Sequence, residues 1–424
     1  MLQNITSANL FSSAPVIHFT PERSTCSRCH TKLKVQKTRA GKRAAALAIG
    51  DFIAHETVYY CPECRKVFHS TELRTLIPEH CDFGYDIIVF IGESLFLQCR
   101  NYQEIRRELL KRNVVISESE IAFEAKKFVL YLGLLHKAVR RKTKKYMKMN
   151  GGYIFHLDGT CDGGSPHLIS ALDGITEIVL DNKKLLSENA EDLIPFLKST
   201  KKAYGVPLAV VSDMGKGIAV AVKEVFNRLR KAMRIALPGN KRGLNDVGEQ
   251  SCNMKTIEKE VGKFRAWLIK SKGYSEHKEY QKLVEQIDKY SEQLFADPIV
   301  VRTPAGKALI QPQRTNNILE RFFRKLMRGY RKKNGFNSVE RILKTMLPET
   351  PLAMNLKNKE YMQILLAGKE SLEERFAEID AQQVRLGLEN SKSEMDMMYP
   401  ELKKIIRMPD LPKSIVALLD QAAS

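Results

Sequence analysis

The alternation of apolar and polar positions in the middle of the chain predicts strands and helices in a definite order. In short segments that end near glycines the apolar residues follow the pattern of strands, and in longer segments they follow helical spacing. The predicted elements are three strands, a helix, a fourth strand and a helix, at residues 153–158, 167–172, 176–181, 189–204, 207–213 and about 217–234. A three-strand run followed by alternating helix and strand predicts a mixed sheet with helices packed against it.

A helical pattern precedes this region. Residues 85–97 are largely apolar, residues 102–110 carry helical spacing, and a further helix opens at Ser117 after a short break. Ser117 and Glu120 form a capping-box pattern, in which the serine caps the helix and the glutamate bonds back to the cap. Helix, brief turn and helix is the layout of a DNA-binding helix-turn-helix, although any helical hairpin gives the same pattern.

Four of the eight cysteines form two C-x-x-C pairs, Cys26 with Cys29 and Cys61 with Cys64. Four thiolates are what a tetrahedral structural Zn²⁺ site requires, and the residues between the pairs alternate as short strands do in a zinc ribbon. A disulfide framework is the alternative, and the lack of a secretory signal at the N-terminus argues against it. The sequence therefore predicts a closed, structural zinc site.

Basic residues exceed acidic ones by 20 in the 424-residue chain, and many of them lie in two knots. Residues 137–148 and residues 321–333 each contain seven Lys or Arg and no acid. A single knot is equally consistent with a solvated surface, but two favour a polyanionic partner, because each neutralised phosphate releases counterions. Nucleic acid is the expected partner, ahead of an acidic membrane. The candidate DNA-binding residues are Arg140, Arg141, Lys144, Lys145, Arg321, Arg324, Arg328 and Arg331.

Three acidic residues are candidates for the metal-binding carboxylates of a nuclease. Asp158 lies on the first predicted strand and Asp213 ends the fourth, so parallel pairing of these strands would make the two carboxylates neighbours. Glu320 opens a predicted helix whose opposite face is apolar, and Arg324 and Arg328 follow it at four-residue steps. Such carboxylates can hold two Mg²⁺ ions for in-line displacement at phosphorus. The alternatives are a turn residue at Asp158, a helix cap at Asp213 and a surface ion pair at Glu320.

The chain resembles bacterial insertion-sequence transposases of the DDE type in three segments, at residues 156–167, 207–217 and 314–335. The last of them, RTNNILERFFRKLMRGYRKKNG, is similar to the T-N-x-x-E element of Mutator-like and related transposases. The resemblance implies an RNase H-like core in which Asp158, Asp213 and Glu320 are catalytic and bind Mg²⁺. It also implies cleavage at element ends, strand transfer, action as a homo-oligomer on double-stranded DNA, and a bacterial, cytoplasmic location at the nucleoid.

Other functions fit the same features. A non-catalytic DNA-binding protein, either a regulator or a decayed transposase, would keep the ribbon, the helices and the charge while its acids served as caps and ion pairs. Relatives usually carry a Cys/Asp-x-x-His element and a longer helical insertion after the second acid, whereas this chain is shorter after Asp213. A structure-specific nuclease on the same core is a third interpretation.

The predicted fold class is multidomain α+β, with a zinc ribbon, a helix-turn-helix and then an RNase H-like α/β core with a helical insertion. The predicted parts are a disordered N-terminus at 1–20, the zinc ribbon at 21–80, the helix-turn-helix region at 85–148, the catalytic domain at 150–345 with its insertion at about 218–300, and a helical C-terminal region at 346–424. Trp267, in the insertion, is expected in a core. No run approaches the ~18 apolar residues of a membrane-spanning helix, which predicts a soluble, intracellular protein.

Overall fold

The computed structural model describes residues 14–212, 243–244, 251–252, 254–271, 274–275, 278–295, 298–313, 316–334 and 338–395. The chain divides into two compact units, Met1–Ile379 and Asp380–Ser424, and each is described by itself. Within the ranges described, no helix is long and apolar enough to cross a membrane. The predicted helix at about 217–234 lies outside the described residues.

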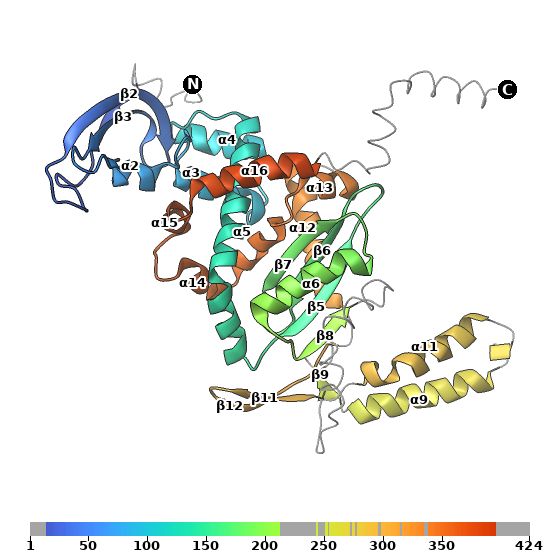
Figure 1. The fold of residues 1–424 in the computed structure, drawn as a ribbon. Helices are drawn as coiled ribbons and strands as arrows, with labels where there is room; N and C mark the ends of the chain where they lie inside the picture. Colours follow the sequence, from blue (N-terminus) through green and yellow to red (C-terminus); the bar gives the residue numbers. More distant parts are fainter. Residues whose placement is uncertain are drawn as a thin grey trace, which may run out of the picture. The chain divides into compact units, whose positions relative to one another are not determined.

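The first sheet contains β1 (Val16–Phe19), β2 (Lys34–Ala46), β3 (Gly50–Tyr60) and β4 (Val67–Phe68). β2 and β3 form a long antiparallel hairpin, β1 pairs with β3 in parallel, and β4 pairs with the end of β3 (Figure 1). β2 is therefore an edge strand, and its residues 34–41 are exposed while Ala44 to Ala46 are buried. The strands between the cysteine pairs are confirmed, and they are longer than the short strands predicted.

β1 lies within the N-terminal stretch that was predicted to be disordered, and at these four residues the prediction was wrong. Its backbone pairs with β3, and Phe19 is buried against Phe52 and against Leu73 of α2 (Thr71–Leu76). Burial of one aromatic side chain together with strand pairing offsets the entropy of ordering so short a segment.

Three helices follow, α3 (Tyr85–Phe96), α4 (Tyr102–Lys111) and α5 (Glu118–Met149). The capping box of Ser117 and Glu120 is confirmed, and Asn101 with Glu104 forms a second one at the start of α4. The three helices share a buried apolar cluster that includes Ile91, Leu109 and Ile121. α5 does not stop before the first basic knot but runs through it for 32 residues, or about 48 Å at 1.5 Å per residue.

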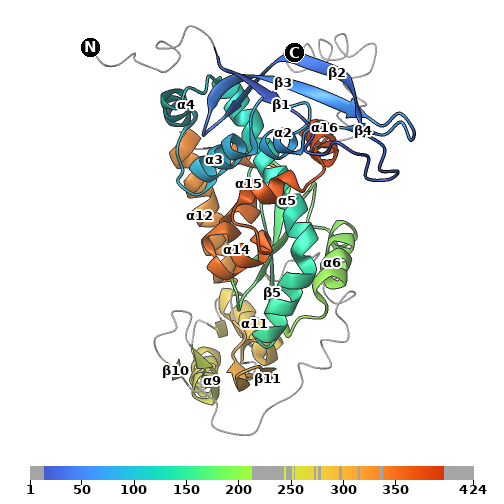
Figure 2. The same cartoon turned by 90° about the vertical axis from the view of Figure 1, so that its left-hand side faces the viewer.

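The second sheet has the order β7-β6-β5-β8, built from β5 (Ile154–Thr160), β6 (His167–Asp173), β7 (Val179–Leu185) and β8 (Ala209–Ser212). β5, β6 and β7 are antiparallel in turn, and β8 joins the other edge of β5 in parallel after the helix α6 (Ala190–Tyr204). Residues 168–173 of β6 are all buried. Such a continuous run is typical of a strand covered on both faces, and α6 and α12 (Asn317–Asn334) lie on opposite sides of the sheet (Figure 2).

A buried hydrogen-bond network joins α5, α6 and this sheet. His136 Nε2 lies 2.8 Å from Leu180 O, and its Nδ1 lies 2.7 Å from the hydroxyl of Tyr361 on α14 (Lys359–Leu366). Tyr204 Oη donates to the same Leu180 carbonyl at 3.1 Å. Burial lowers the pKa of His136 to about 4, so the imidazole is neutral and donates through Nε2.

The remaining elements are short or helical. They are β9 (Gly243–Leu244), β10 (Ser251–Cys252), α9 (Met254–Lys270), α11 (Lys278–Leu294), β11 (Ile299–Thr303), β12 (Gly306–Ile310), α13 (Val339–Thr345), η1 (Thr350–Lys357) and α15 (Leu372–Ala377), with α16 (Ala381–Met395) in the second unit. Helices at 253–295 were predicted, and α9 and α11 confirm them. Trp267 is 62% exposed and stacks on Phe264, so its predicted place in a core was wrong.

Candidate functional site

The two strands that were predicted to carry aspartates are paired in parallel. Leu157 of β5 lies opposite Ser212 of β8, and Asp158 is the next residue of β5. Asp213 follows Ser212 in the chain and lies outside the described residues. Asp158 is half-buried, and its Oδ1 accepts the backbone N–H of Gly159 at 2.9 Å. The predicted parallel pairing is thus confirmed, while the position of the second carboxylate stays a prediction.

The helix that carries Glu320 is fastened to the same strand by one amide side chain. Asn316, the residue before α12, donates from Nδ2 to Leu157 O at 3.0 Å and accepts from His156 Nδ1 at 3.0 Å. Both contacts fall on the two residues that precede Asp158. We call this arrangement the Asn316 clamp.

His156 has a positioning role in this clamp. It is fully buried, and burial lowers its pKa to about 4, so its ring is neutral. Because Asn316 Nδ2 donates to Leu157 O, its Oδ1 must accept, which assigns the imidazole proton to Nδ1. His156 Nε2 then has no hydrogen-bond partner within the described ranges, and a Cβ at Gly174 would lie 2.6 Å from it. Neither the sequence pattern nor the spacing had singled out His156 or Asn316.

Glu320 lies in the first turn of α12 and is exposed, with its backbone N–H bonded to Asn316 O at 3.1 Å. The predicted apolar face is confirmed, since Leu319 and Phe323 are buried. The basic side chains that recur along the opposite face are all exposed: Arg321, Arg324, Arg328 and Arg331. One helix therefore presents a carboxylate at its start and a row of guanidinium groups behind it.

A groove of about 480 Å³ lies beside this row. One wall is the end of β5 and the residues after it, and the other is α12 together with the start of α13. The lining residues are Thr160, Cys161, Asp162, Phe323, Arg324, Met327, Arg328, Arg331 and Val339. Three guanidinium groups against one carboxylate make the groove attractive to an anionic chain such as a nucleic-acid backbone.

The loop that forms one wall of the groove is tied to α13. Asp162 Oδ2 accepts the N–H of Glu340 at 3.3 Å, and Glu340 Oε1 accepts the N–H of Gly164 at 3.2 Å. Lys344 Nζ lies 2.6 Å from the same carboxylate oxygen and lowers the pKa of Glu340. Asp162 and Glu340 therefore hold the wall in place, and the sequence pattern did not indicate this pairing.

The four cysteines of the C-x-x-C pairs lie together at the open end of the β2–β3 hairpin. All four Sγ atoms lie within 4.8 Å of one another, which is compatible with a structural zinc ion. Cys26 and Cys61 are buried, and the Arg28 N–H donates to Cys26 Sγ at 3.4 Å. Of the residues that the structure describes, these four form the one group of three or more possible metal ligands.

The basic residues of the first knot have unequal surroundings. Arg140 is half-buried and pairs with Asp181 at 2.8 Å, and Lys144 is half-buried, whereas Arg141 and Lys145 are exposed. The knot thus contributes both a structural ion pair and free surface charge.

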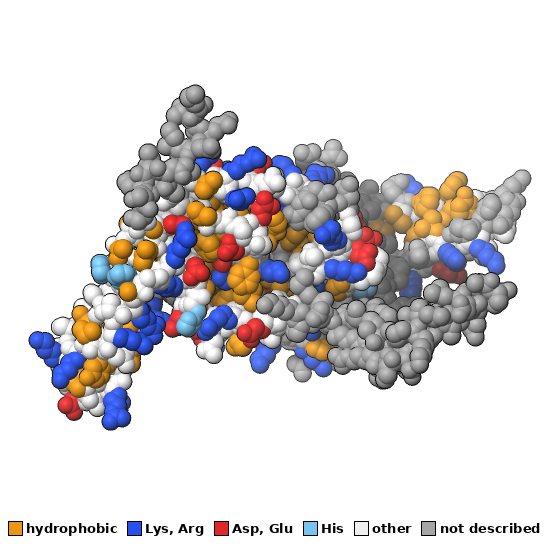
Figure 3. Space-filling view, turned by 90° about the horizontal axis from the view of Figure 1, so that it is seen from above, with side chains coloured by type: hydrophobic (Ala, Val, Ile, Leu, Met, Phe, Trp, Pro, Cys, Tyr) orange, Lys and Arg blue, Asp and Glu red, His pale blue; other side chains and the backbone are white. Residues whose placement is uncertain are grey.

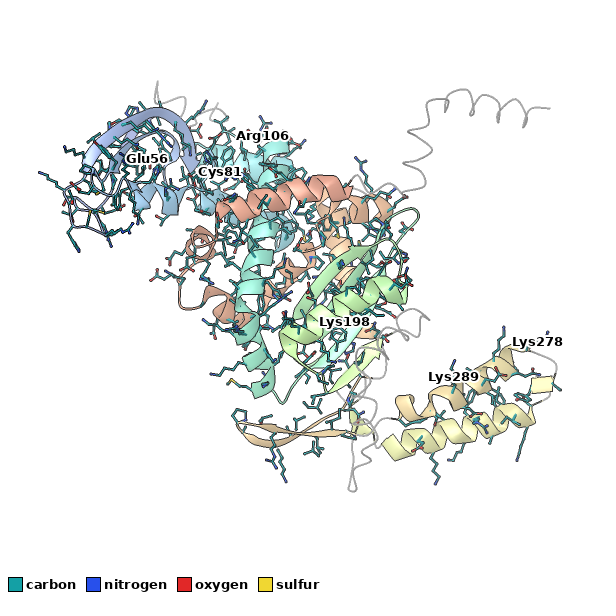
Figure 4. All side chains as sticks on the ribbon, in the orientation of Figure 1. Glu56, Cys81, Arg106, Lys198, Lys278 and Lys289 are labelled. Carbon is teal, nitrogen blue, oxygen red and sulfur yellow. The ribbon has the colours of Figure 1, made fainter. Side chains whose placement is uncertain are left out.

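Other basic residues are dispersed along the sequence and were not predicted as DNA contacts. β2 exposes Lys34, Lys37 and Arg39, and Figure 3 shows Lys and Arg side chains spread over the end that carries β2 and β3. Arg106, labelled in Figure 4, is exposed on α4 next to the exposed Arg107. None of these residues belongs to a long basic run: Lys34, Lys37 and Arg39 are separated by other residues of β2, and acids lie close on both sides of Arg106 and Arg107.

No family model, curated protein or solved structure matches the chain.

Proposed function

We propose that the chain is a DDE-type DNA transposase that cleaves and joins DNA on an RNase H-like core. The main support is the register of β5 and β8, in which Leu157 pairs with Ser212, the residues directly before Asp158 and Asp213. Because the next residue of each strand is an aspartate, continuation of this register would bring the two carboxylates together at one end of the sheet. The strand order β7-β6-β5-β8, with α6 before β8, supports the same core.

The third acid is supplied through the Asn316 clamp. The clamp holds the start of α12 against the two residues that precede Asp158, and Glu320 lies one turn further along the helix. Asp158, Asp213 and Glu320 would hold two Mg²⁺ ions, which suit hard carboxylate oxygens and supply in-line displacement at phosphorus. His156 and Asn316 orient this site, and Arg324, Arg328 and Arg331 hold the DNA backbone in the groove.

DNA binding would extend beyond the groove. The cysteine-ended hairpin exposes Lys34, Lys37 and Arg39, and α4 exposes Arg106 and Arg107 on the first helix of the predicted helix-turn-helix. We propose that these surfaces bind element ends, with the Cys26, Cys29, Cys61 and Cys64 site holding zinc, and that a homo-oligomer assembles on double-stranded DNA.

The test is cleavage and joining of DNA that carries the ends of the host element, with Mg²⁺ or Mn²⁺. Asp158→Asn, Asp213→Asn and Glu320→Gln should each lose cleavage while DNA binding changes little. Glu177→Gln is the matched control, because Glu177 is an exposed acid on the turn between β6 and β7. Cleavage by all three variants at the wild-type rate would contradict the proposal, and cleavage without joining would favour a structure-specific nuclease.

The second candidate is a DNA-binding protein without catalysis. The turn alternative for Asp158 was wrong, because Asp158 pairs with Ser170 within β5. This candidate is favoured instead by the hydrogen bond from the Gly159 N–H to Asp158 Oδ1, which gives the carboxylate a partner without any metal ion. Wild-type protein that binds element ends and never cuts them with either metal would support this candidate.

A further inference from the structure

A second group of cations, most of them on α12, lines another pocket, which shares Arg328 with the groove. This pocket, of about 220 Å³, lies between the end of α3, the second half of α12 and η1. Its walls are largely apolar and include Leu95, Phe96 and Met354. Its cations are Lys325, Arg328, Lys332, Lys333 and Lys357. Among the lining residues, all of them in the described part of the chain, there is no Asp or Glu.

Lys333 is the innermost of these cations. The residue is 7% exposed, and its Nζ lies 4.1 Å from the ring centroid of Phe96 and 3.7 Å from that of Tyr330. It makes no ion pair or hydrogen bond with any residue that the structure describes. Burial lowers the pKa of Lys333 to about 7. Contact with two aromatic faces offsets only part of the cost of burying an ammonium group.

The other titratable groups around Lys333 do not neutralise it. Burial raises the pKa of Tyr330, so its phenol is neutral. The other charged residues that line the pocket are all exposed cations: Lys325, Arg328, Lys332 and Lys357. An apolar side chain at position 333 would pack in these walls without an unpaired charge. The amine is therefore explained better by a ligand than by packing.

We propose that this pocket binds a phosphate group, with Lys333 as its inner cation and Lys325, Lys332 and Lys357 at its rim. A phosphate carries enough charge and enough acceptor oxygens to be shared among several ammonium groups, and lysine binds it as a compact point charge. The phosphate comes from a small phosphorylated compound or from the backbone of a nucleic acid. The site contains none of the three proposed catalytic acids, so it does not depend on the proposed function.

The first test is thermal unfolding of the full chain with inorganic phosphate or pyrophosphate, at constant ionic strength set with chloride. A ligand that binds the folded state raises Tm with its concentration. The Tm of wild-type protein and of the control Lys202→Met, an exposed lysine on α6, should rise equally. The Tm of Lys333→Met should not respond, although this variant should fold at least as stably as wild type without phosphate because it removes an unpaired buried charge.

A second readout does not depend on stability. Acetylation followed by mass spectrometry should modify Lys333 more slowly in phosphate than in chloride, and should modify Lys202 equally in both. Two results would rule out a small phosphorylated compound as the ligand. One is an equal rise of Tm in wild type and Lys333→Met, and the other is a rise of Tm with phosphate that leaves Lys333 unprotected.

A DNA-binding measurement tests whether the phosphate belongs to a nucleic-acid backbone. If neither free anion binds, affinity for a short duplex of arbitrary sequence is measured against salt for wild type, Lys333→Met and Lys202→Met. A backbone phosphate in the pocket predicts that the slope of log affinity against log salt falls by about 0.9 in Lys333→Met, beyond any change in Lys202→Met. Equal slopes in these two variants, together with no response to phosphate or pyrophosphate, would reject the proposal entirely.

Discussion

The two sheets of the chain differ in how much buried core covers them. In the first sheet the edge strand β2 is exposed over residues 34–41, and the open end of the hairpin has only a small cluster around Cys26, Leu33 and Cys61. In the second sheet β6 is buried from residue 168 to residue 173 between helices on both sides. The rest of the first sheet packs on a larger buried cluster that includes Phe19, Phe52 and Leu73. The cysteine end, with so little core of its own, would depend on a bound metal ion for its order, whereas a sheet covered on both faces would not. The first sheet is thus the one that exposes basic side chains along an edge strand.

The largest effect that separates the two sheets is expected from loss of the proposed zinc ion. Cys61→Ser, or a strong chelator, should unfold the end of the hairpin near the cysteines, because structural zinc contributes about 10–16 kcal/mol in small zinc domains. Hydrogen exchange should show lost protection in β2 and β3 and unchanged protection in β5 and β6. Metal analysis of wild-type protein should find one zinc per chain.

Cys161→Ser is the matched control, because Cys161 is exposed and lies outside the cysteine cluster. Full protection of β2 and β3 in Cys61→Ser would show that packing alone holds the first sheet. Equal loss in both sheets would show that the two are one cooperative unit.

Mild acid should act on the second sheet through a buried histidine. The unfolded chain takes up a proton at His136 near pH 6.5, whereas in the folded state its pKa is about 4. Since the unfolded state binds more protons between these values, stability contributed by neutral His136 is present above pH 6.5 and is lost as pH falls towards 4. At about 1.4 kcal/mol per pKa unit, the loss is about 3 kcal/mol.

His136→Gln has no group that titrates at this position. It keeps the buried acids nearby, such as Asp181, whose raised pKa makes the folded state more stable as pH falls, so this effect is the same in both proteins. Urea unfolding of both proteins at several pH values should therefore show the wild type losing about 3 kcal/mol more than the variant between pH 6.5 and 4. Parallel pH profiles for wild type and His136→Gln would mean that His136 is not held neutral.

Much of the second sheet could be predicted from the sequence, because its signals are local. The first two strands after residue 150 and the amphipathic helix before β8 follow from spacing within a few residues. The third strand was predicted at 176–181 but is β7 at Val179–Leu185, so its bounds were wrong by three to four residues. The capping box at Ser117, at the start of α5, is an equally local signal. The Asn316 clamp could not be predicted, since it joins residues 160 positions apart through an asparagine whose type is common in turns. Burial of Trp267 was predicted from its apolar ring, but the helical pair α9 and α11 leaves that ring exposed.

The smallest of these effects, and the most selective, is expected at the Asn316 clamp. Asn316→Ala leaves Leu157 O and His156 Nδ1 without their partner, at a cost of about 1–3 kcal/mol. Because the clamp also sets the start of the helix that carries Glu320, cleavage should fall much further than the loss of folded protein explains, while affinity for element ends changes little.

Asn355 provides a matched control on the same sheet. Its amide spans the backbone of Val179 in β7, accepting from N at 2.8 Å and donating to O at 2.9 Å, so Asn355→Ala removes two similar hydrogen bonds from a buried site. Assayed at a temperature where both variants remain folded, Asn355→Ala should cleave near the wild-type rate and Asn316→Ala should not. Equal cleavage by the two variants would make the clamp a packing contact like any other, and would remove the structural reason for including Glu320 in the site.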